Sequence, residues 1–274
     1  KPAGSKFDHG LVLMVCGSRG MLGSAALATT AALRSGCGMV HAAVPAGALD
    51  VLAGKVTEVV LHPIDQTEEG TPGAEARLKI LNMAQRMQCL CVGPGISHNA
   101  ETGALVRELV AAAQLPVVLD ADGINAFKDR SEELKNHQNQ LLITPHAGEW
   151  GRLFDPLPDN PARAFERLAH TAAEFDMTIV YKGNPTRIAT PGGQCYLVPA
   201  GNSGLASAGS GDVLCGLVAG LVAQGCKPDN AALLGVYLHG ECANAAAKQR
   251  NEYAMIASDL LDTIHTAFAT LDGS

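Results

Sequence analysis

Residues 202–225 read NSGLASAGSGDVLCGLVAGLVAQG, a run of small residues that leads into an uncharged, mostly apolar stretch. The segment predicts a helix that starts at GSGD (209–212) and ends near Gln224, with Gly225 as its C-terminal stop. A helix this apolar belongs in a core. Asp212 is the one acid at its start, and neither a buried helix nor a flexible linker needs a carboxylate there.

Outside this helix, short apolar runs alternate with helix-length segments. Runs that are apolar on both faces and are separated in this way are typical of a parallel sheet covered by helices on both sides. Most of them end in or beside Gly, Asp or Thr, at the edge where such sheets bind ligands. The predicted strands of this kind are 11–16, 39–44, 89–93, 116–120 and 140–144.

The pattern changes after Met177. A further strand is followed by a hairpin, whose two strands are joined at Pro191-Gly192-Gly193. No linker, internal repeat or low-complexity segment interrupts the chain, so we predict a single α/β domain over residues 1–274. The strand, the hairpin and the two helices that follow the apolar segment are predicted at 178–183, 186–199, 229–248 and 257–269.

Composition excludes several classes of function. Hydrophobic residues make up 47% of the chain, enough for a sizeable core, and the formal net charge is −7. This charge argues against a protein that binds nucleic acid or an anionic membrane, although backbone amides can still bind a small anion. No signal peptide is evident, and no apolar run approaches the roughly 18 residues that span a bilayer. The chain starts at Lys1, which fits a processed or excerpted piece.

The eight cysteines form no CxxC pair, and most lie in apolar runs. Cysteine acts there as a small hydrophobic side chain, so we expect reduced thiols and a cytoplasmic protein. The nine histidines show no HExxH or HxH spacing, and we therefore predict no protein-bound zinc.

Two interpretations of Asp212 are open at this point. Small residues before a helix leave backbone N–H groups accessible to a phosphate, and a carboxylate would oppose that phosphate unless it took part in chemistry. Alternatively, Asp212 is simply the N-cap of the helix. Polar residues at four other strand ends favour the interpretation in which Asp212 takes part in chemistry, because a parallel sheet would gather them around one crevice. These ends are GPG (93–95), LDADGIN (119–125), TPHAGEW (144–150) and YKGNPT (181–186).

These segments together resemble one family. GSRGMLGSAALATTAALRSGCG, VGPG, LDADGIN, TPHAGE, VYKGNPT, the segment at 202–225 and YLHGECA occur in the order seen in NAD(P)H-hydrate dehydratases. These are ribokinase-like enzymes that use ADP, or ATP in eukaryotic members, to repair the hydrated cofactors NADHX and NADPHX. The resemblance runs from Lys6 to Ala246. GSGD alone is shared with other ribokinase-like kinases, whereas the combination of GPG, TPHxGE and KGN is more specific.

The resemblance implies a role for each matching residue. It implies a ribokinase-like fold with a predominantly parallel sheet, helices on both faces and a C-terminal hairpin region. Ser24 departs from the family, which often has Ala at this position. The residues expected to bind the adenine nucleotide are Lys182, Gly183, Asn184, Pro185, Thr186 and Gly211. Those expected to face the hydrated dinucleotide are Ser24, Ala25, Gly95, His146 and Asp212, with Asp122, Asn125, Glu149 and Asn202 as secondary candidates.

The same resemblance implies a mechanism. Asp212 would accept the proton of the substrate hydroxyl while that hydroxyl attacks the nucleotide, and amides of residues 210–212 would stabilise the transferred phosphoryl group. It also implies Mg²⁺ held largely by phosphates, a homotetramer, and an epimerase that is fused to the chain or works with it. Two alternatives remain: a ribokinase-like vitamin-precursor kinase, and a non-enzymatic nucleotide-binding module in which Asp212 only caps its helix.

Overall fold

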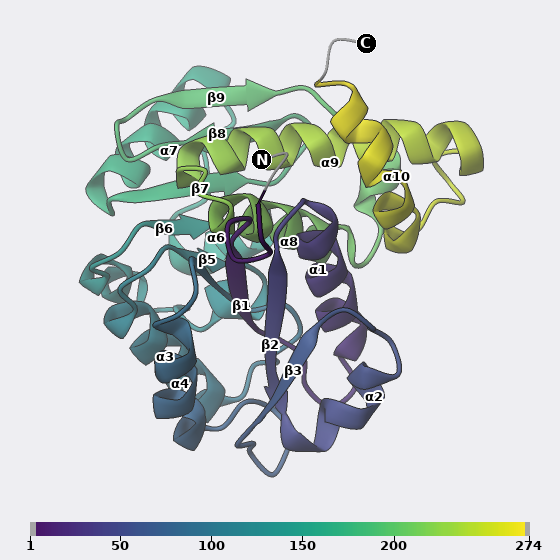
Figure 1. The fold of residues 1–274 in the computed structure, drawn as a ribbon. Helices are drawn as coiled ribbons and strands as arrows, with labels where there is room; N and C mark the ends of the chain where they lie inside the picture. The colour runs from purple at the N-terminus through teal and green to yellow at the C-terminus, as the bar shows by residue number, and fades with distance from the viewer. Residues whose placement is uncertain (1–3, 272–274) are drawn as a thin grey trace.

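The computed structural model describes residues 4–271, and its centre is one nine-stranded sheet (Figure 1). The spatial order is β3-β2-β1-β4-β5-β6-β7-β8-β9. The strands are β1 (Leu11–Val15), β2 (Met39–Pro45), β3 (Val60–Ile64), β4 (Cys89–Val92), β5 (Val117–Leu119), β6 (Leu141–Ile143), β7 (Met177–Tyr181), β8 (Thr186–Ala189) and β9 (Cys195–Val198).

All pairings from β3 across to β7 are parallel, and β8 and β9 add an antiparallel hairpin at the far edge. The predicted parallel sheet and hairpin are therefore confirmed. β3 was not predicted from the sequence. It is an edge strand that contains Pro63 and leaves several side chains accessible, so it lacks the continuous apolar run that marks a buried strand.

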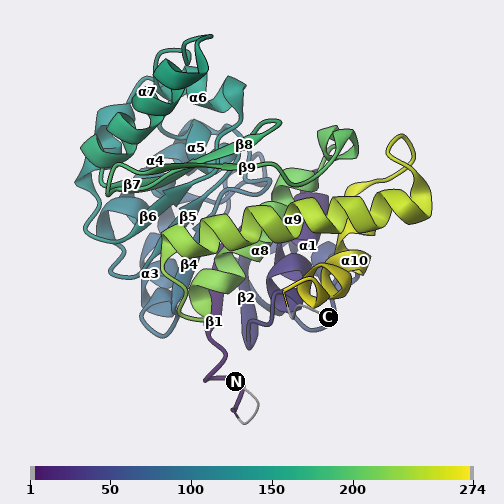
Figure 2. The ribbon, with the colours of Figure 1, turned by 90° about the horizontal axis from the view of Figure 1, so that it is seen from above.

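Helices cover both faces of the sheet (Figures 1 and 2). Side chains alternate along each strand: Val12 and Met14 of β1 belong to one core cluster, and Leu13 and Val15 belong to the other. The first cluster takes in α1 (Leu22–Arg34), α2 (Leu49–Ala53), α8 (Ser210–Ala223), α9 (Pro228–Arg250) and α10 (Ala257–Ala269). The second takes in α3 (Arg77–Ala84), α4 (Ala100–Ala112), α5 (Asp122–Asn125), α6 (Ala147–Leu153) and α7 (Pro161–Glu174).

The apolar helix predicted from residues 209–224 is α8, and it lies against α1. A Cβ atom at Gly216 would come within 2.1 Å of the Ala28 carbonyl oxygen, and one at Gly220 would come within 2.7 Å of the Ala32 carbonyl oxygen. Only glycine permits this close backbone approach. Successive glycines of α8 contact successive turns of α1 in the same chain direction, so the two helices run parallel. Their N-termini therefore lie on the same side of the sheet.

All eight cysteines are free thiols, and six of them are buried. This agrees with the expected role of cysteine as a small apolar core side chain. Within residues 4–271, no helix combines the length and the apolar character needed to cross a membrane.

Candidate active site

Helix α8 starts with exposed backbone donors. Its N-cap is Gly209 in the left-handed region (φ +89°), and no side chain caps the helix. The amides of Gly211 and Asp212 have no acceptor among residues 4–271, whereas the Ser210 amide donates to the Ser207 carbonyl. Asp212 is the third residue of the helix and not its cap, so the cap interpretation is wrong. The start of α8 can therefore receive an anion beside a carboxylate.

The Asp212 carboxyl has an unusual proton affinity. Burial and the negative charge of Asp120 raise its pKa to about 7, with a smaller contribution from Asp122. The Ser24 side chain and the Lys182 ammonium act in the opposite direction. A carboxyl group with a pKa near 7 can take up and release protons at neutral pH, as a general base requires.

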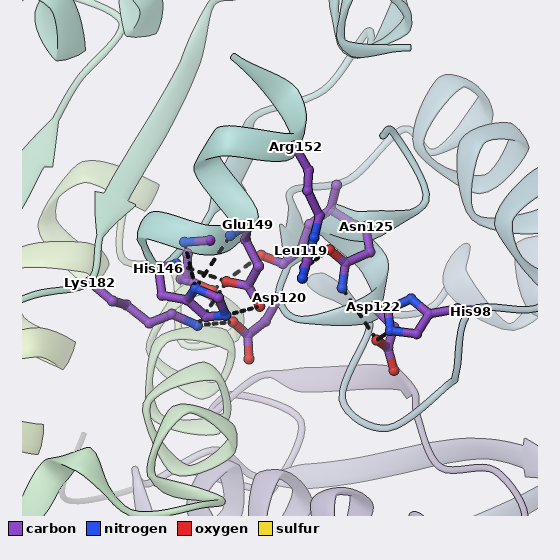
Figure 3. Close-up of polar contacts among 11 residues, drawn as sticks. His98, Leu119, Asp120, Asp122, Asn125, His146, Glu149, Arg152 and Lys182 are labelled. Atoms are coloured by element: carbon purple, nitrogen blue, oxygen red, sulfur yellow. Dashed lines mark hydrogen bonds and ion pairs between the residues drawn. The ribbon is translucent and has the colours of Figure 1, made fainter. Parts of the chain in front are cut away.

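A buried charge cluster lies at the carboxyl ends of three adjacent parallel strands (Figure 3). Asp120 follows β5, Glu149 lies in α6 after β6, and Lys182 follows β7. Lys182 Nζ lies 2.8 Å from Asp120 Oδ1 and 3.4 Å from Glu149 Oε2. Thr144 Oγ1 also donates to Asp120 Oδ1 over 2.6 Å. Sequence reasoning noted Asp120 in its motif but gave it no role in the site.

Partners on both sides fix the charge of Lys182. Burial lowers the pKa of the ammonium, but Asp120 and Glu149 outweigh burial and raise it to about 12. Lys182 is therefore fully protonated at neutral pH. Because one side chain bridges two carboxylates from different segments, one after β5 and one in α6, its ammonium has little freedom to move.

His146 is the N-cap of α6. Its Nδ1 accepts hydrogen bonds from the Gly148 and Glu149 amides at 2.9 and 3.3 Å, and the Glu149 carboxylate accepts the His146 amide at 2.8 Å. Nδ1 therefore carries no proton, and Nε2 is the donor of a half-exposed ring, 3.4 Å from Glu149 Oε1. The cap fixes the orientation of the ring, and a ligand that takes the Nε2–H would replace its long contact with Glu149.

A cavity of about 510 Å³ brings together most residues of the predicted nucleotide motif. This volume suits a small-molecule site. Pro185 does not line the cavity, although it follows Asn184 directly in the chain. Among the predicted residues, those that line it are His146, Lys182, Gly183, Asn184, Thr186, Asn202 and Gly211.

His239 also lines this cavity and was not predicted as a site residue. Its Nε2 contacts the Ser210 carbonyl oxygen at 2.9 Å, and burial lowers its pKa to about 4. The imidazole is therefore neutral and supports the first turn of α8. His239 lies in the YLHGECA segment that was part of the family resemblance, but no role was given to it, because only packing brings the middle of α9 to the cavity.

The predicted contacts from the N-terminal part of the chain meet near the start of α1. Gly95 has φ +66°, and a Cβ atom there would lie 2.6 Å from the Met21 carbonyl oxygen and 3.0 Å from Ser24 Cβ. Ser24 also acts on the Asp212 carboxyl, as described above. Ala25 is fully buried in the core, so in this structure it presents no accessible surface to a ligand.

Asp122 and Asn125 do not share this cavity. They line a second one, also of about 510 Å³, together with His98 and Arg152. Asp122 accepts the Ser97 amide at 2.8 Å. Arg152 donates to Asn125 at 2.7 Å (Figure 3). The strand ends were expected to surround one crevice, but the structure divides them between two cavities.

The part of the chain that the structure describes shows no dedicated set of side chains for the expected Mg²⁺. Within residues 4–271, no group of three or more His, Cys, Asp or Glu side chains could hold a metal ion. The buried carboxylates Asp120 and Glu149 are already paired with Lys182, which lines the cavity. Protein ligands alone therefore do not form a metal site here.

Comparisons with known proteins agree with this geometry. The model of the NAD(P)H-hydrate dehydratase family matches residues 12–266. A bifunctional NAD(P)H-hydrate repair enzyme of Moorella thermoacetica is 42% identical over 271 residues, which cover 98% of this chain and 51% of that protein. The chain thus spans about half the length of this relative.

Two solved structures share the fold. An ADP/ATP-dependent NAD(P)H-hydrate dehydratase from Bacillus subtilis, co-crystallised with ATP and Mg²⁺, has 28% identity and a TM-score of 0.81, covering 98% of this chain and 92% of that one. A ribokinase-like superfamily protein from Enterococcus faecalis V583 has 24% identity and a TM-score of 0.82, covering 98% and 90%. The sequence match over almost the whole chain and the shared ribokinase-like fold lead to one conclusion: this chain belongs to the NAD(P)H-hydrate dehydratase family.

Proposed function

We propose that this chain dehydrates hydrated NADH and NADPH at the expense of ADP, releasing AMP and phosphate. The observation that carries the proposal is the Asp212 carboxyl, with a pKa of about 7, in the uncapped first turn of α8 beside a nucleotide-sized cavity. An anion-binding helix start and a neutral-pH base within one turn are what phosphoryl transfer to a hydroxyl requires.

The proposed reaction has two steps. The C6 hydroxyl oxygen of the hydrated ring bonds to the β-phosphorus of ADP, the bond from that phosphorus to the bridging oxygen breaks, AMP keeps the electron pair, and Asp212 takes the hydroxyl proton. The ring nitrogen lone pair then expels phosphate from C6, and loss of a C5 proton restores the dihydropyridine. The Gly211 and Asp212 amides would stabilise the charge on the transferred oxygens.

Ligand roles follow from the cavity and the family. Lys182, Gly183, Asn184, Thr186 and Gly211 would bind the adenine nucleotide, and Mg²⁺ would be held mainly by its phosphates and neutralise their charge. Ser24, Gly95 and the Nε2–H of His146 would face the hydrated dinucleotide. We also propose a homotetramer in the cytoplasm. The relatives that this chain half covers are bifunctional, so we propose that it acts alongside an epimerase.

An assay of hydrated NADH with ADP or ATP tests the proposal. A dehydratase restores the absorbance of NADH and releases one phosphate per turnover. A small-molecule kinase would instead leave a stable phosphoester, and a binding module would produce neither product. If purified protein restores no NADH with either nucleotide, the proposed function is wrong.

A further inference from the structure

The Lys182 ammonium has one N–H group that neither Asp120 nor Glu149 accepts. An ammonium carries three N–H donors, of which Asp120 takes one at 2.8 Å and Glu149 faces a second at 3.4 Å. Both carboxylates are buried, whereas Lys182 keeps 19% of its side chain exposed and lines the cavity. The third donor is therefore available to a ligand in that cavity.

This donor lies beside the anion-binding start of α8. A Cβ atom placed on Gly211 would lie 3.6 Å from Lys182 Nζ, so the ammonium is next to the first turn of the helix. The Lys182 charge also acts on Asp212 and on His239, which flank the same turn. The ammonium and the free amides of Gly211 and Asp212 thus converge on one place.

Two buried carboxylates are a poor arrangement for ordinary nucleotide affinity. They compete with nucleotide phosphates for the ammonium, and they place negative charge near an anionic ligand. Their benefit is fixed geometry, because an ammonium that is already held in place needs no reorganisation when charge develops in a transition state. The cluster therefore suits catalysis better than tight binding of the ground state.

Building on the proposed dehydration, we propose that Lys182 is a catalytic residue that contacts an oxygen of the phosphoryl group in transit. Asp120 and Glu149 are positioning residues that hold its ammonium against the first turn of α8. In the transition state, negative charge is spread over the non-bridging oxygens of the phosphoryl group in transit. The third Lys182 donor stabilises this charge, while Asp212 takes the hydroxyl proton.

Substitution of Lys182 tests the catalytic role. Lys182→Met should lower kcat by about 10²- to 10³-fold, as for loss of one transition-state donor. The dissociation constant of ADP, measured by calorimetry, should rise by less than about tenfold, and affinity for hydrated NADH should change less. A loss confined to ADP affinity with normal kcat would overturn the proposal.

Lys182→Met alone leaves Asp120 buried without its partner and can fail to fold for that reason. The double variant Lys182→Met/Asp120→Asn removes the closer of the two ion pairs, while Glu149 keeps its hydrogen bond from the His146 amide, so it should melt closer to the wild type than Lys182→Met does. It should still be as inactive as the single variant. A double variant with wild-type kcat would show that Lys182 is only a counter-ion of Asp120, and the proposal would fall.

Lys135 provides a matched control. It also lies between two carboxylates, Glu132 at 2.9 Å and Glu174 at 2.8 Å, but away from the cavity. Lys135→Met should leave kcat and ADP affinity unchanged. A loss of activity equal to that of Lys182→Met would mean that the substitution acts through general destabilisation.

The positioning role of Asp120 has its own readout, the pH profile of kcat. Asp120 and Asp122 raise the pKa of Asp212, and Lys182 and Ser24 lower it, with burial as the largest influence. Asp120→Asn should therefore move the acidic limb of the profile to lower pH and reduce kcat, while the ADP dissociation constant stays near the wild-type value. An unmoved acidic limb with normal kcat would overturn this role.

These outcomes are separable from failure of the proposed function. If the wild-type protein restores no NADH from hydrated NADH and ADP, the dehydratase proposal itself is wrong. If the wild type is active and the Lys182 and Asp120 variants match it, only the inference about the charge cluster is wrong.

Discussion

Lys182 and Lys135 each lie between two carboxylates, but at opposite ends of the strands: Lys182 at the carboxyl ends and Lys135 at the amino ends. Lys182 lies beyond the carboxyl ends of β5, β6 and β7, with Asp120 and Glu149. Lys135 precedes β6 and pairs with Glu132 and with Glu174, which ends α7. The shortest Nζ–O distance is 2.8 Å in both clusters.

The two clusters differ in their exposure to water. The Lys135 side chain is 33% exposed, and those of Glu132 and Glu174 are 75% and 44% exposed. The carboxylates of the other cluster are only 2% and 6% exposed. Neighbouring carboxylates raise the pKa of both lysines. The two clusters therefore differ neither in the direction of the pKa shift nor in the shortest Nζ–O distance. Water screens the exposed cluster, whereas burial makes the other cluster sensitive to each neighbouring charge.

The largest expected effect concerns the base beside the buried cluster. Asp212→Asn should lower turnover of hydrated NADH by about 10²- to 10⁴-fold, because the amide cannot accept the hydroxyl proton. ADP binding should persist, since the amides at the start of α8 remain. Steady-state kinetics and ADP calorimetry on the same preparation measure both. Near-normal turnover would show that Asp212 is not the base. The buried Lys182 cluster would then have no catalytic base beside it to distinguish it from the exposed Lys135 cluster.

The next effect concerns His146. His146→Ala should raise KM for hydrated NADH by about 10- to 100-fold, by loss of a hydrogen bond to a charged group. Affinity for ADP should change little. His146→Asn is the matched control, because Asn can also cap α6 but lacks the Nε2–H donor.

Both variants should therefore show the higher KM, while only His146→Ala should lose about 1 kcal/mol of stability with the cap. Full activity should return after chelation when Mg²⁺ alone is resupplied. A normal KM in His146→Asn would limit His146 to capping, and stoichiometric zinc at His146 would also contradict its role.

A smaller effect is expected from pH. The pKa of Asp212 is raised to about 7, first by burial and then by Asp120, so the base becomes protonated as pH falls through 7. We expect kcat to be highest above pH 7 and to fall by about tenfold per unit well below it. A plateau of kcat that extends down to pH 5 in the wild type would show that the carboxyl keeps an ordinary pKa.

The smallest effect is expected at the exposed cluster. Lys135→Met should leave the melting temperature nearly unchanged, because solvent-exposed ion pairs contribute little. Lys182→Met should lower the melting temperature clearly, because it leaves buried carboxylates unpaired. Thermal unfolding of both variants at one pH compares them directly. Equal losses would mean that burial is not what separates the two clusters.

Much of the fold could be predicted from local pattern. Apolar runs placed the parallel strands, the Pro191-Gly192-Gly193 turn placed the hairpin, and the uncharged stretch after Asp212 placed α8. β3 escaped prediction because an accessible edge strand has no continuous apolar run. The prediction that the polar residues at the strand ends surround one crevice was wrong in part, since Asp122 and Asn125 line a different cavity from Lys182.

The sequence by itself determined which residue types stand at the strand ends and at the start of α8, because these follow from neighbours along the chain. Tertiary structure alone decided which charges are buried together. Asp120 and Lys182 lie 62 residues apart, and His239 and Ser210 lie 29 apart. The pKa of Asp212 depends on burial and on the charge of Asp120, which are properties of the packed sheet and helices. Electrostatic energies depend on distance in space and on exclusion of water, and neither is encoded in local spacing.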